Sequence, residues 1–306
     1  MRVLITGAAG FLGRVVVAAL AERGHDPVAF VREGRNSPPQ ASASVTGDLR
    51  DLASLKAAVA GVDGVCHLAA LKRVRESLAA PLPYWQTNVG GTLNLLEALA
   101  DRPQPAKLVL ASTAAIYGTP ARQPIAEDAP TDPQNPYGAS KLAADLAAAN
   151  VATTGAVGAI SLRAFNIAGG FAGTSDPDLT RLIPKVLAVQ AGLASEVGVN
   201  GDGSAVRDFV HVLDMANAFV LALEACAPGK WRAYNVGSGR RSSVADVLAA
   251  AEQVTGRPVP AKHNPPASEP PVLLADSSRI RDELGWQPKN SDLAQILSDG
   301  WKALTS

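Results

Sequence analysis

Three glycines near the start of the chain constrain its fold most strongly. Gly7, Gly10 and Gly13 lie between a short apolar run at residues 3–5 and a segment of helical periodicity at residues 11–22. The first glycine permits a tight turn, the second lets the backbone approach a bound group, and the third lets the helix pack closely against the strand. The start of the helix offers unpaired N–H groups and the positive end of its dipole. This junction therefore predicts a strand–turn–helix unit that holds a pyrophosphate.

Short apolar runs and helical segments continue to alternate after this unit. Such alternation needs crossover connections, and it predicts an α/β fold with a doubly wound parallel (Rossmann) sheet. The pattern loosens after residue 165, so we expect a dinucleotide-binding Rossmann domain over residues 1–165 and a smaller C-terminal α/β substrate domain over residues 166–306. A segment at about 209–237 resumes the pattern and is expected to return to the first domain. The other predicted strands are residues 27–31, 44–46, 62–68, 107–111, 157–162 and 234–236, and the other predicted helices are residues 52–60, 84–100, 137–154 and 213–226.

The composition argues against several classes of function. The chain has 306 residues, of which 47% are hydrophobic, and its 28 basic and 28 acidic residues give a formal net charge of zero. A neutral chain argues against a general nucleic-acid or membrane-surface binder, and no apolar run is long enough to span a membrane. Cys66 and Cys226 form no Cys-x-x-Cys pair, and the four histidines have no metal-ligand spacing. We therefore expect a cytoplasmic protein that binds no metal, nucleic acid or membrane.

The end of the second predicted strand bears on the choice of dinucleotide. NAD-binding sites of this type usually carry an acidic residue there for the adenosine ribose. Here the position is Val31, followed by Arg32, with Arg35 nearby. A guanidinium accepts a 2′-phosphate, which favours NADP, while the alternative is a solvated arginine in a loop. Asp48 ends the third predicted strand, where its carboxylate could accept from the amino group of adenine.

Two later groups of residues predict a reactive centre. Tyr137 and Lys141 share one helix face because they are four residues apart, and Asn135 is expected to cap that helix. A neighbouring ammonium favours the phenolate form of tyrosine, so Tyr137 could remove a proton from a substrate hydroxyl. Ser112 and Thr113 end a strand at the edge where ligands bind in open α/β sheets. Their hydroxyls could bond to the reacting oxygen.

With the glycine turn, the strand-end hydroxyls and the Tyr/Lys pair in this order, the chain resembles an extended short-chain dehydrogenase/reductase. Within that group it is most similar to the UDP-glucose (UDP-galactose) 4-epimerase family, over nearly its whole length. The resemblance is carried by residues 67–77, 81–92, 110–118, 162–166 and 203–212. It implies a nucleotide-sugar substrate, a homodimer that pairs the predicted helices 84–100 and 137–154, and a nucleotide-sugar-binding role for residues 166–306.

The resemblance also assigns site residues. It implies catalysis by Thr113, Tyr137 and Lys141, with Ser112 as a second hydroxyl. The residues that it places around the cofactor, together with those named above, are Gly7, Gly10, Phe11, Leu12, Gly13, Arg32, Asp48, Leu49, Leu68, Ala69, Ala70, Lys72, Asn88, Tyr137 and Lys141. The residues that it places around the substrate are Lys72, Thr113, Tyr137, Asn166, Arg207 and Glu269.

The chain departs from the family pattern at several positions. Val31 replaces the NAD-selecting acid, so the cofactor is expected to be NAD, with NADP possible. Pro266 falls where the family has a second arginine for the diphosphate, and Leu273 falls where a bulky aromatic limits the sugar pocket. A smaller side chain there leaves room for a larger 2-substituent such as N-acetyl.

The expected activity is epimerisation at carbon 4 of a nucleotide-linked hexose through a transient 4-keto sugar. The sugar is of the UDP-glucose/UDP-galactose type, with UDP-N-acetylhexosamine or UDP-glucuronate as alternatives. A rival function is an NADP-dependent nucleotide-sugar reductase or dehydrogenase, and another is a dinucleotide-sensing protein without turnover. A 4,6-dehydratase is disfavoured because Ala114 and Ala115, which follow Thr113, cannot transfer protons.

Overall fold

The chain is divided between two compact units that interleave along the sequence. The computed structural model describes residues 1–266 and 269–306. Unit 1 comprises Met1–Gly118, Glu127–Ala164 and Ala216–Tyr234, and unit 2 comprises Thr119–Ala126, Phe165–Met215 and Asn235–Ser306. Within the described residues, no helix is both long enough and apolar enough to cross a membrane.

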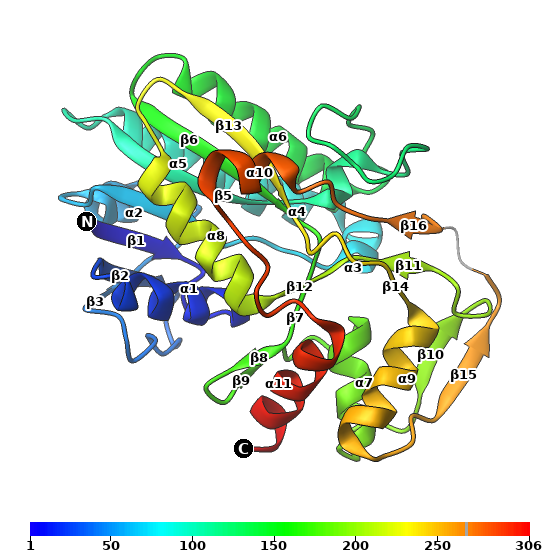
Figure 1. The fold of residues 1–306 in the computed structure, drawn as a ribbon. Helices are drawn as coiled ribbons and strands as arrows, with labels where there is room; N and C mark the ends of the chain where they lie inside the picture. Colours follow the sequence, from blue (N-terminus) through cyan, green and yellow to red (C-terminus); the bar gives the residue numbers. More distant parts are fainter. Residues whose placement is uncertain (267–268) are drawn as a thin grey trace. The chain divides into compact units, whose positions relative to one another are not determined.

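A seven-stranded parallel sheet forms the centre of unit 1 (Figure 1). Its strands follow the order β13-β6-β5-β4-β1-β2-β3, which confirms the predicted doubly wound α/β fold. The direction of the strand order reverses beside β1, so the loops after β1 and β4 start from neighbouring strand ends, where ligands bind in such sheets. The strands are β1 (Arg2–Thr6), β2 (Asp26–Val31), β3 (Ala43–Thr46), β4 (Gly64–His67), β5 (Ala106–Thr113), β6 (Val157–Ala164) and β13 (Trp231–Val236).

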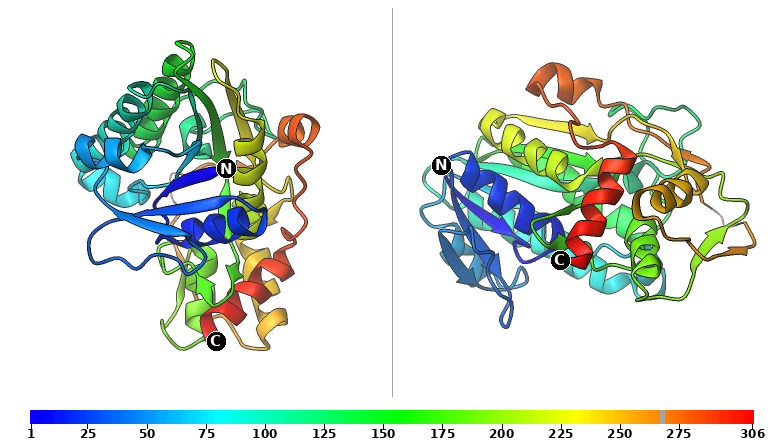
Figure 2. Two further views of the ribbon diagram at one scale, coloured as in Figure 1. Left: turned by 90° about the vertical axis from the view of Figure 1, so that its left-hand side faces the viewer. Right: turned by 60° about the horizontal axis from the view of Figure 1, so that its bottom comes forward.

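Helices cover both faces of this sheet (Figure 2). Apolar side chains of α2 (Leu52–Val59), α5 (Gly91–Ala100) and α6 (Pro136–Ala152) form one core with the strands. The opposite face is covered by α1 (Phe11–Glu22) and by α8 (Val212–Ala225), whose residues from Ala216 onward belong to unit 1. The shorter helices of this unit are α3 (Val74–Ala79), α4 (Pro81–Tyr84), the π-helical segment Trp85–Gly90 and the 3-10 segment Ala114–Tyr117.

Residues 84–100 are helical throughout, as predicted, but they do not form one regular α-helix. The structure has α4, then the π-helical segment Trp85–Gly90, and only then α5. The Thr92 hydroxyl donates to the Asn88 carbonyl at 2.6 Å, and the Asn88 side chain bonds to the backbone of Leu71. These bonds accompany the local widening of the helix, and periodicity alone does not reveal them. Such π-bulges are frequent at functional sites.

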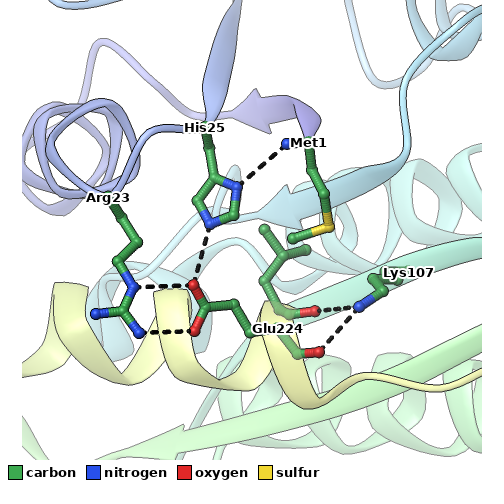
Figure 3. A network of polar contacts seen from close by, with 6 residues as sticks. Met1, Arg23, His25, Lys107 and Glu224 are labelled. Atoms are coloured by element: carbon green, nitrogen blue, oxygen red, sulfur yellow. Dashed lines mark hydrogen bonds and ion pairs between the residues drawn. The ribbon is translucent and has the colours of Figure 1, made fainter.

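Polar contacts fasten the end of α8 to the sheet and to the turn after α1 (Figure 3). The Arg23 guanidinium donates to both carboxylate oxygens of Glu224 at 3.0 and 3.2 Å, and His25 Nε2 lies 3.3 Å from the same carboxylate. The Lys107 ammonium, from β5, donates to the carbonyls of Leu223 and Glu224 at 3.1 and 2.9 Å. These carbonyls lie in the last turn of α8, where they lack partners within the helix. The contacts therefore fix where α8 ends.

Unit 2 has its own core and small sheets. Strands β14, β11 and β16 form a three-stranded sheet, and β10 pairs with β15, β12 with β7, and β8 with β9. Helices α7 (Leu182–Gln190), α9 (Val244–Thr255) and α11 (Leu293–Thr305) share one apolar cluster, and α10 (Ser278–Leu284) completes the unit. Its strands are β7 (Asn166–Ala168), β8 (Gly170–Phe171), β9 (Thr174–Ser175), β10 (Val197–Asn200), β11 (Val206–Arg207), β12 (Phe209–His211), β14 (Ser242–Ser243), β15 (Ala261–Asn264) and β16 (Val272–Leu273).

Candidate active site

The glycine turn between β1 and α1 has no room for side chains. A Cβ added to Gly13 would lie 2.1 Å from the Gly7 carbonyl oxygen, and one added to Gly7 would lie 2.8 Å from the Ala69 nitrogen. Gly7 also has a φ of 73°, which disfavours other residues. Gly10 caps α1 without a side chain, so the N–H groups of the first helical turn remain open to a ligand. This backbone cradle fits a dinucleotide pyrophosphate.

A chain of polar side chains fixes the loop after β4 against this turn. Thr6 Oγ1 lies 2.7 Å from His67 Nδ1 and accepts from the Ala69 N–H at 3.2 Å, while His67 Nε2 lies 3.1 Å from Thr92 Oγ1. Burial lowers the pKa of His67 to about 3, so its ring is neutral. The half-buried segment Leu68–Ala70 is therefore held beside Gly7.

Asn88 joins the same loop to α6. Its side chain accepts from the Leu71 N–H at 2.8 Å and donates to the Leu71 carbonyl and to Ser140 Oγ, each at 3.0 Å. Asn88 is buried, and its amide is committed to these three contacts. Lys72, next to the clamped residue, is exposed. The structure thus gives Asn88 a positioning role for the loop that bears Lys72.

The carboxyl end of β5 lies against the first turn of α6. Thr113 is the last residue of β5, and its side chain accepts from the Ala115 N–H at 3.2 Å. A Cβ on Gly138 would lie 2.6 Å from the Ala115 carbonyl oxygen, so only glycine allows this approach. Ser112 is buried beneath the strand end. Close packing therefore places the end of β5 next to the helix turn that contains Tyr137, while the Ser112 hydroxyl faces Asp145, two turns further along α6.

Helix α6 presents Tyr137 and Lys141 one turn apart. It begins as predicted, with the Asn135 side chain accepting from the Gly138 N–H at 2.9 Å and with Pro136 at the first helical position. The half-buried Tyr137 ring meets Tyr84 edge to face, with centroids 6.4 Å apart. Lys141 is only 4% exposed, and the charge of Asp145, one further turn along the helix, acts on its ammonium. Burying an ammonium is costly, so a ligand that accepts a hydrogen bond from Lys141 would stabilise it here.

Sequence reasoning missed a buried ion pair behind Lys141. Asp145, one further turn along α6, accepts from Arg163 Nε of β6 at 3.2 Å, and Arg163 Nη1 donates to the Tyr117 hydroxyl at 2.8 Å. Burial raises the pKa of Asp145, and Arg163 with the hydroxyls of Ser112 and Ser161 opposes that rise. The sequence offered one signal for this pair, because Asp145 follows Lys141 by four residues and so shares its helix face. The partner, Arg163, lies in a different element, β6, and local spacing does not indicate it.

The buried lysine predicts how activity depends on pH. Burial lowers the pKa of Lys141 from 10.5 to about 8, and the charge of Asp145 opposes this shift. If the Lys141 ammonium has the role expected from the sequence, which is to favour a Tyr137 phenolate, activity should fall as the pH rises through about 8, where Lys141 loses its charge. The variant Asp145→Asn should move this fall to lower pH, because the charge of Asp145 raises the pKa of Lys141. The measurement is kcat/KM between pH 6 and 10 for the wild-type protein and for Asp145→Asn. Identical pH profiles for the two proteins would contradict the role given to Lys141.

At the ends of β2 and β3, the sequence-predicted residues lie around one hollow. Asp48 is bound by Arg50, which donates from Nε and Nη2 at 3.0 and 2.9 Å, and this arginine lowers the pKa of Asp48 to about 2. Leu49 is buried against Gly91. Arg32, the first residue after β2, is exposed and lines the hollow together with Asp48.

The substrate residues expected in unit 2 form a group of their own. Arg207 of β11 donates to the carbonyls of Val206 and Pro270, each at 2.9 Å, and forms an ion pair with Glu269. Glu269 also accepts from Asn200 at 3.0 Å. The structure therefore joins two residues that were both expected to contact the substrate.

A buried carboxylate supports the strand that carries Arg207. Asp208 accepts from the N–H groups of Ser238, Gly239 and Ala275 at 2.7 to 3.1 Å and from Ser238 Oγ at 2.8 Å. The Asp208 carbonyl accepts from the Asn166 side chain at 3.0 Å. Asn166 and Arg207 are thus held in one network. Among the residues that the structure describes, no cluster of His, Cys, Asp or Glu could hold a metal ion.

Comparisons with known proteins agree with these features. A UDP-glucose 4-epimerase of Corynebacterium glutamicum is 42% identical over 318 residues, covering 100% of this chain and 96% of the relative. The crystal structure of UDP-glucose-4-epimerase from Stenotrophomonas maltophila, with bound NAD and formylated UDP-arabinopyranose, has a TM-score of 0.93 and 34% identity, covering 100% of this chain and 98% of that one.

A second solved structure gives the same result. UDP-glucose 4-epimerase from Bifidobacterium longum, in complex with NAD+ and UDP, has a TM-score of 0.92 and 31% identity, covering 100% of this chain and 98% of that one. The model of the NAD dependent epimerase/dehydratase family matches residues 3–237, which include the glycine turn and the Tyr137–Lys141 pair. The chain therefore belongs to the NAD dependent epimerase/dehydratase family.

Proposed function

We propose that this protein is a UDP-glucose 4-epimerase that uses NAD to interconvert UDP-glucose and UDP-galactose. The observation that carries the proposal is the Tyr137–Lys141 pair, packed against the end of β5 in a chain 42% identical to a UDP-glucose 4-epimerase. The similar structures contain NAD together with UDP or a UDP-sugar. Unit 1 binds the dinucleotide, and unit 2 contributes the groups that hold the nucleotide sugar.

The cradle of Gly7, Gly10 and Gly13 would hold the pyrophosphate of the cofactor, and the Lys141 ammonium would donate to another part of the cofactor, near Tyr137. When bound, NAD would supply reversible hydride-transfer chemistry at carbon 4 of the sugar. The chain's own chemistry is proton transfer and orientation. Tyr137 removes the proton of the 4-hydroxyl and later gives it back to the oxygen of the 4-keto sugar.

The neighbouring residues support Tyr137 in distinct ways. The Lys141 ammonium stabilises the phenolate, and Thr113 donates to the oxygen on carbon 4, with Ser112 behind it. In unit 2, Arg207 holds the diphosphate, because a guanidinium can donate to two phosphate oxygens at once. The diphosphate then takes the position of Glu269 at this arginine, and Asn166 contributes a further donor.

The test of this function is whether turnover is redox-neutral. Purified protein is incubated with UDP-galactose, the products are separated by chromatography, and absorbance at the reduced-nicotinamide band is followed. We expect UDP-glucose to form with no net change in external dinucleotide. Consumption of dinucleotide in proportion to product would instead establish a reductase or dehydrogenase. UDP-N-acetylgalactosamine serves as a second substrate, since Leu273, which pairs with Arg207 across β11 and β16, is smaller than an aromatic residue.

A homodimer is also proposed, and apolar side chains on unit 1 support it. Leu82, Trp85, Leu93 and Leu146 are 41–69% exposed, and they lie on or next to α4, α5 and α6. Exposed apolar residues gathered on neighbouring helices are typical of protein interfaces. The occupant we propose is the same surface of a second copy, in a two-fold arrangement.

The dimer proposal predicts the effect of one charge. Leu146→Glu should halve the mass measured by light scattering after gel filtration, because the interface would bury an unpaired carboxylate. Leu193→Glu is the matched control, since Leu193 is 67% exposed but lies in unit 2, and its mass should not change. A mass unaltered by Leu146→Glu would exclude this surface.

We further propose that the protein works in the reducing environment of the cytoplasm. Cys66 and Cys226 are both free and both buried in unit 1, so oxidation to a stabilising disulfide is not part of the fold. The test is to unfold the protein without a reducing agent and to label it with a thiol reagent. Modification of both cysteines is expected, because neither is in a disulfide.

A further inference from the structure

A hollow at the carboxyl ends of β2 and β3 is lined by two arginines, Arg32 and Arg35, that hold no carboxylate at ion-pair distance among the described residues. The cavity has a volume of about 390 Å³ and is lined by Arg32, Glu33, Arg35, Thr46, Gly47 and Asp48. In the described part of the chain, the guanidinium groups of Arg32 and Arg35 form neither an ion pair nor a hydrogen bond. Arg50, Arg163 and Arg207, by contrast, are each bound to a carboxylate.

A tight turn brings the two arginines together. The Arg35 N–H donates to the Arg32 carbonyl at 3.0 Å, and Gly34, the third residue of this turn, has a φ of 73°. A turn with positive φ at its third residue requires glycine or asparagine there. The two side chains therefore leave from the two ends of one four-residue turn, directly after the last residue of β2.

The charges around the hollow leave it positive. Asp48 is neutralised by Arg50, which holds both of its carboxylate oxygens. Glu33 then offers one negative charge against the two positive charges of Arg32 and Arg35. The strand end that usually carries the acid for a ribose hydroxyl is Val31, which is buried and offers no acceptor.

Position decides which anion this hollow would receive. The glycine turn follows β1, and β1, β2 and β3 are adjacent parallel strands, so the hollow lies along the same sheet edge as the pyrophosphate cradle. In doubly wound sheets this edge beside β2 faces the adenosine ribose of a bound dinucleotide. A phosphate there carries up to two negative charges and three acceptor oxygens, which suit two guanidinium groups.

We propose that Arg32 and Arg35 form a binding site for the 2′-phosphate of NADP, so that this chain accepts NADP as well as NAD. The inference rests on the proposed function, because it concerns the cofactor of the same site. Arg32 and Arg35 donate to the phosphate oxygens, while the glycine turn holds the pyrophosphate of either dinucleotide. The choice between the two cofactors is then made by these arginines and by the absent carboxylate at Val31.

Binding of NAD+ and NADP+ to dinucleotide-free protein, measured by isothermal titration calorimetry, tests the site directly. We expect the Kd for NADP+ to be no larger than that for NAD+. Arg32→Gln and Arg35→Gln should each raise the Kd for NADP+ about tenfold and leave that for NAD+ within twofold. Arg122→Gln is the matched control, since Arg122 is exposed in unit 2 and does not line the hollow. Val31→Asp should weaken NADP+ binding alone, because it restores a negative charge at the strand end.

Smaller probes separate the phosphate from the rest of the cofactor. The wild-type protein should bind 2′,5′-ADP more tightly than 5′-AMP, and the Arg32→Gln variant should remove that difference. NADP+ binding more than tenfold weaker than NAD+, or equal losses for both dinucleotides in the arginine variants, would overturn the inference. If the protein does not bind NADP+ but binds NAD+ and still converts UDP-galactose, only the proposed 2′-phosphate site is rejected. If neither dinucleotide binds and no sugar is converted, the proposed function falls with it.

Discussion

Replacing Tyr137 with phenylalanine should lower kcat by about three orders of magnitude while the protein still folds and binds its dinucleotide. Proton transfer by a positioned side chain contributes about 10²–10⁴-fold to a rate, and Tyr137 is the group that exchanges the proton of the 4-hydroxyl. The variant loses only the hydroxyl, and the ring keeps its edge-to-face contact with Tyr84. Initial rates of UDP-galactose conversion, with calorimetry of NAD+ binding, measure the two effects separately.

The matched control for this variant is Tyr84→Phe. The Tyr84 hydroxyl donates to the Arg73 carbonyl at 2.7 Å and belongs to the packing around Tyr137. Removing it should cost some stability and leave kcat within a few-fold of the wild-type value. A rate in Tyr137→Phe equal to that of Tyr84→Phe would argue against every catalytic role given to Tyr137.

A methyl group at Gly13 should destabilise the whole of unit 1. The added Cβ would lie 2.1 Å from the Gly7 carbonyl and 2.8 Å from Ala8 Cα, and both neighbours are backbone atoms that cannot rotate away. Inserting a methyl group into a packed region typically costs about 1–3 kcal/mol, and here the start of α1 must also move away from β1. Gly13→Ala is therefore expected to lower Tm by several degrees and to abolish detectable NAD+ binding.

Gly10→Ala separates folding from binding at the same turn. Its Cβ would meet only the Gly7 carbonyl, at 3.2 Å, and the residue is exposed with an ordinary φ of −78°. We expect a Tm close to that of the wild type and a weaker affinity for NAD+, because the new methyl group occupies the approach to the pyrophosphate. Calorimetric scans with and without NAD+ give both quantities. A larger loss of Tm in Gly10→Ala than in Gly13→Ala would contradict the packing described for this turn.

The parts of the site that depend on short-range sequence could be predicted. Glycine at positions 7, 10 and 13, the Asn135 cap and the spacing of Tyr137 and Lys141 each depend on neighbours within one turn or one helix. Alternation of strands and helices then predicts which strand ends share an edge. For this reason the order of elements alone predicts that Thr113 and Tyr137 lie near the same edge of the sheet.

The parts that sequence reasoning did not reach depend on contacts between distant segments. Asp145 finds Arg163 only because β6 lies beside β5 and beneath α6, and the Arg207–Glu269 pair joins residues 62 positions apart. The π-helical segment before α5 was missed because Asn88 bonds to Leu71, in a loop that periodicity does not describe. Local patterns predict which backbone forms, and these side-chain partners become visible only once the sheet order is known.

The late return of β13 to the sheet limits how the polypeptide can be cut. All eight residues of β6 are buried, and β6 lies between β5 and β13 in the strand order. A fragment that stops at residue 165 would leave one whole margin of β6 without backbone partners and would strip α8 from the sheet. Exposed edge strands pair with other chains, so such a fragment is expected to aggregate. It would therefore not give a soluble domain that binds the cofactor on its own. Engineers who want that half alone must splice residues 216–236 back onto it.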